Sequence, residues 1–248
     1  MRSLALEFSK LRRKHVLLIA LALVAAVLVW LFADAHGEGR GSATGWHSLF
    51  FAAPIMNSVF LSLLSTVVAS RVADVDHEAN AWKQLLCLQG AGSLLVAKLV
   101  CALLVVALAV ILELGGIVVI GRVWEFTDPL PVGSWATLTL SQLAASLCMV
   151  SVIGAVALLW ENQFVAVSSG LTLSLAGLFS SFLPTALQRL VPSGYYTLLT
   201  TMLVNWGDGS GAPVFYETAL PLFDYALVVA FSATACAYAY TMFSRREG

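Results

Sequence analysis

Charge is scarce in this chain. Asp, Glu, Lys and Arg make up only 11% of its 248 residues, against roughly 25% in soluble globular domains. Hydrophobic residues make up 60% of the sequence, and its mean hydropathy is +0.90. These values exclude a soluble globular fold and predict a polytopic membrane protein. The net charge is −1, and we expect no nucleic-acid partner.

Motifs for catalysis and nucleotide binding are also missing. The sequence has no G-x-x-x-x-G-K-[ST] phosphate loop, no H-E-x-x-H, no G-x-S-x-G and no pair of histidines at helical spacing. We therefore expect neither an enzyme nor a cofactor or metal held by this chain. The cysteines show neither metal-ligand nor disulfide-framework spacing, and we interpret them as small apolar residues. They are Cys87, Cys101, Cys148 and Cys236.

Long apolar runs are what the sequence does contain. Six of them approach or exceed the roughly 18 to 20 residues that cross a bilayer, and the alternating pattern of a β-barrel is absent. The first run is longer than the roughly 7 to 15 apolar residues of a secretory signal, so we interpret it as a retained anchor. The predicted fold is an all-α polytopic membrane protein, one domain over residues 1–248. Its six transmembrane helices are expected at 16–33, 49–70, 94–121, 135–160, 163–183 and 222–243.

The basic residues give the orientation. If both termini are cytoplasmic, ten of the thirteen Lys and Arg residues lie inside, and only Arg40, Arg122 and Arg189 lie outside. By the positive-inside rule, this distribution predicts that both termini and the loop at 71–93 face the cytoplasm.

The N-terminal segment 1–15 has the pattern of a helix lying in the headgroup plane. Leu4, Phe8 and Leu11 recur at i, i+4 and i+7, while its cations occupy other faces. We expect an interfacial helix on anionic inner-leaflet lipid. The alternative is a charge cluster that only sets the topology.

The loop at 71–93 is the longest charged segment expected between two spans on the inside. Acidic residues favour the start of a short helix, and the apolar face of this helix begins with a tryptophan. Gly90 and Gly92 are expected to end the helix. Such a helix presents a docking surface to a cytosolic partner; the alternative is an ordinary interfacial connector. The candidate coupling residues are Asp76, Glu78, Trp82, Lys83, Leu85 and Leu86.

At these residues the chain resembles the six-span permease subunits of type-2 ABC exporters, and among them the permeases of lantibiotic-immunity and bacitracin-resistance transporters. The resemblance covers the layout of the whole chain, although Gln89 replaces a proline that is common at the end of the coupling helix. Its motifs are Ser70-Arg71, Asp76-His77-Glu78, Asn80, Trp82-Lys83, Leu85-Leu86 and Ala97-Lys98.

The resemblance implies a division of labour. The 71–93 loop would be a coupling helix docking on ABC ATP-binding subunits, which would bind ATP and Mg²⁺. It also implies a second identical or homologous permease, a location in the bacterial cytoplasmic (inner) membrane, and export of an amphipathic antimicrobial peptide of the lantibiotic type. Export of a lipid-linked or small hydrophobic drug is an alternative, as is a non-transporting membrane scaffold or sensor.

Polar residues inside the predicted spans mark a candidate pathway. Glu113 lies midway through the third span, where a carboxylate is costly, and Asn57 lies in the polar-dotted second span. The alternatives are a structural carboxyl and polar contacts that hold helices together. In the fifth span, Ala166, Gly170 and Ser174 form a small-residue face that is expected to pack on another helix, within the chain or across a permease dimer.

The segment 184–221 is too apolar for a water-exposed loop and too interrupted for a seventh span. We expect two short helices split at residues 192–194, forming an outer re-entrant or interfacial hairpin. Its aromatic residues Tyr195, Tyr196 and Trp206 are candidates for substrate contact or for a membrane-anchoring belt. Asp208, Glu217 and Asp224 are expected on the same side, where they would attract a cationic peptide arriving from the outer leaflet; the alternative is that they are solvated loop residues.

Overall fold

The computed structural model describes residues 15–78, 90–160, 162–206 and 213–244. The predicted N-terminal interfacial helix, apart from its last residue, lies outside these ranges. So do the predicted coupling residues Trp82, Lys83, Leu85 and Leu86.

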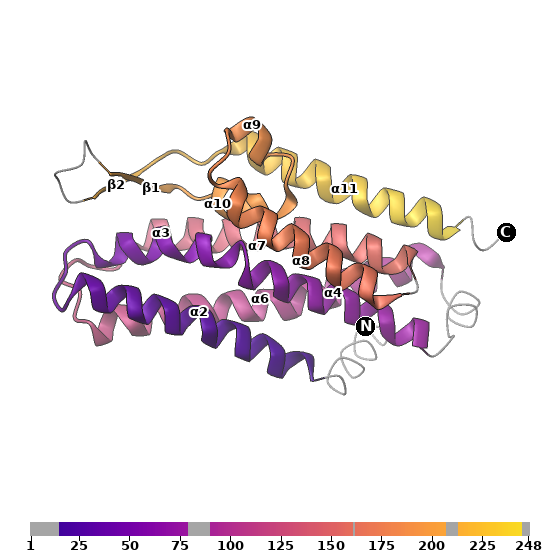
Figure 1. The fold of residues 1–248 in the computed structure, drawn as a ribbon, viewed down its shortest axis with the longest axis horizontal. Coiled ribbons are helices and arrows are strands. Elements are labelled where there is room, and N and C mark those ends of the chain that lie inside the picture. Colours follow the sequence, from indigo (N-terminus) through magenta and orange to yellow (C-terminus); the bar gives the residue numbers. More distant parts are fainter. Residues whose placement is uncertain (1–14, 79–89, 161, 207–212, 245–248) are drawn as a thin grey trace.

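Long helices lie side by side along one axis (Figure 1). Over the described residues, five are long and apolar enough to span a membrane, and the count is six if the bent pair α3 and α4 forms one span. The protein is therefore a helical multi-pass membrane protein. The helices are α2 (Val16–Glu38), α3 (Gly45–Asn57), α4 (Phe60–Glu78), α6 (Ala91–Val123), α7 (Val132–Leu159), α8 (Gln163–Ser180) and α11 (Leu222–Ser244).

The second predicted span is not one continuous helix. It divides into α3 and α4, which meet at a bend of 40°. Pro54 has no amide hydrogen to donate, which weakens the helix just before the break. At the break itself, the Ser58 hydroxyl donates to the Ile55 carbonyl at 2.7 Å, and the Val59 amide bonds to the Met56 carbonyl in a tighter turn.

The helix of the second predicted span does not end at residue 70. Helix α4 continues through Asp74 and Asp76 to Glu78, so these acids end one helix instead of beginning another. Neither glycine nor proline occurs between residues 70 and 78, and nothing in the local sequence stops the helix. Gly92 is likewise not a stop, because it lies inside α6, where Gly90 is the N-cap.

The outer segment contains more structure than two short helices. Helix α9 (Thr185–Gln188) and helix α10 (Tyr195–Leu198) flank a 3-10 turn, η1 (Pro192–Gly194). A two-stranded antiparallel ribbon follows, formed by β1 (Met202–Asn205) and β2 (Val214–Glu217), with Met202 opposite Glu217. This ribbon is the departure from the all-α prediction, and its Val, Phe and Tyr residues favour extended structure.

Helix α4 lies at the centre of the bundle and packs against α2, α6, α7 and α8, while α11 packs mainly on α7. The ribbon projects from one end of the bundle, and the C-terminus of α11 lies at the other (Figure 1). The residues between α4 and α7 are therefore shielded on several sides by other helices.

Candidate functional site

Buried polar side chains form a seam along α4 in the interior of the bundle, on the faces that pack on α7 and α8. Each of these side chains is at most 3% exposed, although the surrounding core is apolar. Polar groups buried in a membrane bundle hold helices together or line a pathway. The seam comprises Asn57 and Ser58 near the break, Ser62, Ser65, Thr66 and Ser70 on α4, and Ser141, Gln142, Ser146 and Ser151 on α7.

Tyr196 of α10 reaches into the middle of this seam. Its side chain is fully buried, and its hydroxyl forms hydrogen bonds with Ser65 of α4 at 3.2 Å and Ser146 of α7 at 3.0 Å. The Gln142 side-chain amide donates to the Tyr196 carbonyl at 3.2 Å. One tyrosine of the outer segment thus joins two central helices. Ser141, Gln142 and Ser146, polar residues within an apolar span, are the sequence feature that indicates this contact.

Asn57 and Glu113 form a second buried contact, beside the break. The Asn57 side-chain amide donates to Glu113 Oε1 at 2.7 Å, and the two residues are 1% and 2% exposed. Within the described part of the chain, Asn57 Oδ1 has no hydrogen-bond partner. The structure brings these two predicted pathway residues together, and their contact ties the end of α3 to α6.

The small-residue face of α8 packs within the chain. A Cβ atom added at Gly170 would lie 2.1 Å from Thr66 Cγ2 of α4, so the two helices approach too closely for any side chain there. The Ser174 and Ser62 hydroxyls form a hydrogen bond at 2.8 Å across the same contact. Of the two arrangements that the sequence left open, the structure shows the intramolecular one for these residues.

The outer segment is also fixed to α8. The Ser193 hydroxyl of η1 donates to the Leu173 carbonyl, and Ser193 fills the space beside Gly177. Tyr195 is fully buried, and its hydroxyl donates to the Arg189 carbonyl at 2.9 Å. The segment is therefore seated on three spans, α4, α7 and α8, instead of lying loosely over them.

The three outer aromatic residues singled out from the sequence do not share one surface. Tyr195 and Tyr196 are buried in the bundle, whereas Trp206 is 66% exposed and lies edge-on to Phe51 with ring centroids 6.5 Å apart. In this conformation only Trp206 is accessible to a substrate.

The predicted acidic cluster is also divided. Asp224 forms an ion pair with Arg189, whose guanidinium donates to both carboxylate oxygens at 2.6 and 3.3 Å. This pairing raises the pKa of Arg189 above its ordinary value. Glu217 accepts a hydrogen bond from Ser134 of α7, and Asp208 lies outside the described residues. Asp224 is therefore not a free anionic site.

The first of the predicted coupling residues, Asp76 and Glu78, lie at the end of α4 that is away from the ribbon (Figure 1). The backbone of Asp76 and Glu78 belongs to α4, but their side chains are outside what the structure describes. The Lys98 ammonium of α6 donates to the Val72 carbonyl of α4 at 2.7 Å and is 4% exposed, so it joins the two helices. Arg71 and Asp74 form an ion pair at 3.5 Å.

These features define the class of the protein. It is a membrane-embedded helical bundle, and in the described ranges no group of three or more His, Cys, Asp or Glu residues could hold a metal ion.

The family model of the ABC-2 family transporter protein matches residues 3–179, and the chain belongs to this family. The protein is therefore a membrane permease component of an ABC transporter. It is not itself the ATPase, and it associates with ABC ATP-binding subunits. None of the curated proteins compared with the sequence matches it.

Proposed function

We propose that this permease exports a cationic amphipathic peptide that it captures at the outer leaflet of a bacterial cytoplasmic membrane. In this proposal two permeases, identical or homologous, assemble with two ATP-binding subunits, and both termini face the cytoplasm. A lantibiotic-type peptide is the substrate favoured by the sequence resemblance.

The observation that carries this proposal is the exposed apolar surface around the outer segment. Phe182, Leu190 and Leu222 are 84%, 67% and 73% exposed at the base of the segment. The exposed Trp206 lies on the ribbon beyond them. Apolar side chains at this level suit contact with a peptide whose own apolar face lies in the lipid headgroup region.

Charge at the same end favours a cationic substrate. The residues expected outside include seven acids and three bases, a formal balance of −4. The acids are Asp34, Glu38, Glu125, Asp128, Asp208, Glu217 and Asp224, and the bases are Arg40, Arg122 and Arg189. Although Asp224 is neutralised by Arg189, the remaining excess produces a negative potential that concentrates positively charged peptides.

Helix α4 provides a physical connection between this surface and the ATP-binding subunits. Ser65 contacts Tyr196 of the outer segment, and Glu78 ends the same helix beside the predicted coupling loop. Glu78 lies 13 positions after Ser65, which is about 20 Å along a continuous helix. Movement of the loop would thus be transmitted along α4 to the Tyr196 contact and to the polar seam.

Two matched variants test this function. The permease is coexpressed with the ATP-binding subunit that copurifies with it, in a host that is sensitive to lantibiotics. We expect Trp206→Ala to lower several-fold the lantibiotic concentration that the host survives. The variant should still copurify with the ATP-binding subunit. Trp160→Ala is the control, because Trp160 is similarly exposed, at 52%, on the opposite end of the bundle. Equal protection by both variants, or no protection by the wild type, would contradict the proposal.

A further inference from the structure

Glu113 is a buried acid that the export function leaves unexplained. It lies in α6, ten positions before the last residue of that helix, which is about 15 Å along the helix axis. Its side chain is 2% exposed, and the gap beside it is too narrow for a water molecule. Glu113 therefore lies in a dry apolar environment. The other residues that line the gap are Leu23, Val24 and Val27 of α2 and Phe60, Leu61 and Leu64 of α4.

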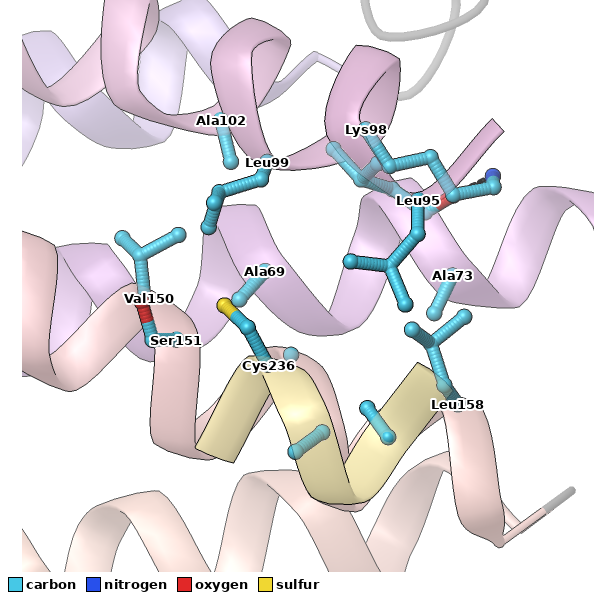
Figure 2. A pocket seen from close by; sticks show the side chains of 14 residues that line it. Ala69, Ala73, Leu95, Lys98, Leu99, Ala102, Val150, Ser151, Leu158 and Cys236 are labelled. Atoms are coloured by element: carbon cyan, nitrogen blue, oxygen red, sulfur yellow. Dashed lines mark hydrogen bonds between the residues drawn. The ribbon is translucent and has the colours of Figure 1, made fainter. Parts of the chain in front are cut away.

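Among the described residues, no cation lies beside Glu113 to neutralise it, and Glu113 forms an ion pair with none of them. On its own helix, Lys98 is 15 positions away, or about 22 Å, and Arg122 is 9 positions away, or about 14 Å. Lys98 lines a separate cavity between α4, α6, α7 and α11, to which Glu113 does not contribute (Figure 2). An ionised Glu113 would thus be a buried charge without a counter-ion, which is costly.

The described elements that pack on α6 bring no charge to this gap. On α2 and α4, the charged residues nearest to the gap are Asp34 and Arg71, each seven positions beyond the lining residues and about 10 Å along its helix. His47 of α3 is ten positions, or about 15 Å, before the end of that helix. Helix α7 contains no charged residue, and Asp224 of α11 is paired with Arg189.

Tyr196 of α10 is the titratable side chain that interacts electrostatically with Glu113. A phenol stays neutral over the pH range in which carboxyl groups titrate. The protonation of Glu113 therefore depends on its dry surroundings and on its hydrogen-bond partner.

That partner, Asn57, lacks the donor that a neutral carboxyl group provides. The Asn57 side-chain amide donates to Glu113 Oε1 at 2.7 Å, but Asn57 Oδ1 is buried and has no partner among the described residues. An ionised Glu113 has no hydrogen to donate, so it leaves Oδ1 unpartnered and adds a negative charge beside it. A protonated Glu113 carries one O–H donor, which Oδ1 can accept. The neutral form therefore satisfies both side chains.

We propose that Glu113 is a proton-binding site, and that its protonated carboxyl forms reciprocal hydrogen bonds with Asn57 in this conformation. Asn57 is the last residue of α3, directly before the break to α4, whereas Glu113 belongs to α6. The neutral pair thus holds the break against α6. Release of the proton leaves a carboxylate that requires hydration. Because the gap admits no water, α2 and α4 must move apart beside it, and this loosens the break. The site is independent of the exported substrate.

Glu113→Gln separates the hydrogen bonds of the pair from its proton. A glutamine side chain both accepts and donates, so it can form the same reciprocal bonds with Asn57 at every pH. The variant should therefore fold, but it cannot release a proton. Glu125→Gln is the matched control, because Glu125 is an exposed acid just after the end of α6 and its replacement removes the same formal charge.

The first measurement is the infrared difference spectrum between the wild type and Glu113→Gln, recorded on the full chain in lipid nanodiscs with the ATP-binding subunit that copurifies with it. At neutral pH the wild type should show the carbonyl stretching band of a protonated carboxyl, and the band should disappear as the pH is raised. Asn57→Leu should shift this band to a higher frequency, because the carboxyl loses its hydrogen-bond partner. The difference spectrum for Glu125→Gln should show an ionised carboxylate instead.

Hydrogen exchange followed by mass spectrometry tests the link to the break. In peptides that cover residues 54–63, the wild type and Glu113→Gln should exchange equally at neutral pH. Once the pH is high enough to remove the carboxyl band, the wild type should exchange several-fold faster than Glu113→Gln. Comparison at the same pH cancels the intrinsic pH dependence of exchange, and Glu125→Gln should follow the wild type.

Each result that contradicts the proposal removes a different part of it. A carboxylate signal at neutral pH, or a band that persists throughout the pH range, overturns reversible proton binding by Glu113. A band that Asn57→Leu leaves unchanged overturns the reciprocal pair. Equal exchange in the wild type and Glu113→Gln after loss of the band overturns the link between the proton and the break.

Discussion

Replacing Gly170 by alanine tests whether α8 packs on α4 within one chain. The added methyl group would lie 2.1 to 2.7 Å from three side-chain atoms of Thr66. Thr66 cannot easily move away, because it is β-branched and its hydroxyl is bonded to the Ser62 carbonyl at 3.0 Å. The methyl group therefore forces the two helices apart.

The magnitude follows from two opposing effects. Overpacking of this severity costs about 3 kcal/mol, and replacing a helical glycine by alanine returns up to about 1 kcal/mol. We expect Gly170→Ala to lower the free energy of unfolding by about 2 kcal/mol, a decrease in melting temperature on the order of 4–8 °C for a chain of this size. Gly115→Ala should raise it slightly, because only the helix gain applies where no described atom lies within 4 Å.

Thermal unfolding in detergent with a thiol-reactive dye measures both variants. Cys101 and Cys148 are fully buried in the native state, so the dye reports their exposure as the bundle opens. If the Gly170 face belonged to a permease dimer instead, dilution would change the effect of Gly170→Ala on melting. A melting temperature equal to that of the wild type would refute the intramolecular packing.

Three further outcomes are expected. Tyr196→Phe should lower the free energy of unfolding by about 1–2 kcal/mol, since it leaves the Ser65 and Ser146 hydroxyls without their shared partner. The control is Tyr238→Phe, at an exposed position on α11, which should change the free energy of unfolding little in the same melting assay. Trp82→Ala should uncouple transport from ATP hydrolysis while leaving expression intact, and full export by this variant would show that the loop is not a coupling helix. In a cysteine-free background, an impermeant maleimide added to intact cells should label Gly37→Cys but not Asn80→Cys, and the reverse pattern would invert the topology.

The sequence was sufficient for the class of the protein and for most of its elements. Hydropathy is a local property, so each apolar run predicts a helix without knowledge of its neighbours. The interruption at Pro192–Gly194 and the small-residue face around Gly170 are local patterns too, and both are present in the structure. The break between α3 and α4 was missed, although Pro54 and Ser58 are the residues that favour it.

Partners within the fold were decided only by tertiary structure. A periodic pattern shows that one face of α8 is small, but not that Thr66 of α4 meets it. Nor does an aromatic residue in an outer segment show whether it is exposed, as Trp206 is, or fills a polar seam, as Tyr196 does. Asp224 could be placed at the outer end of a span from the sequence, but its pairing with Arg189, 35 residues earlier, depends on how the segment between them folds back. Helix type follows from neighbouring residues, whereas contacts follow from the packing of surfaces distant in sequence, which periodicity alone does not specify.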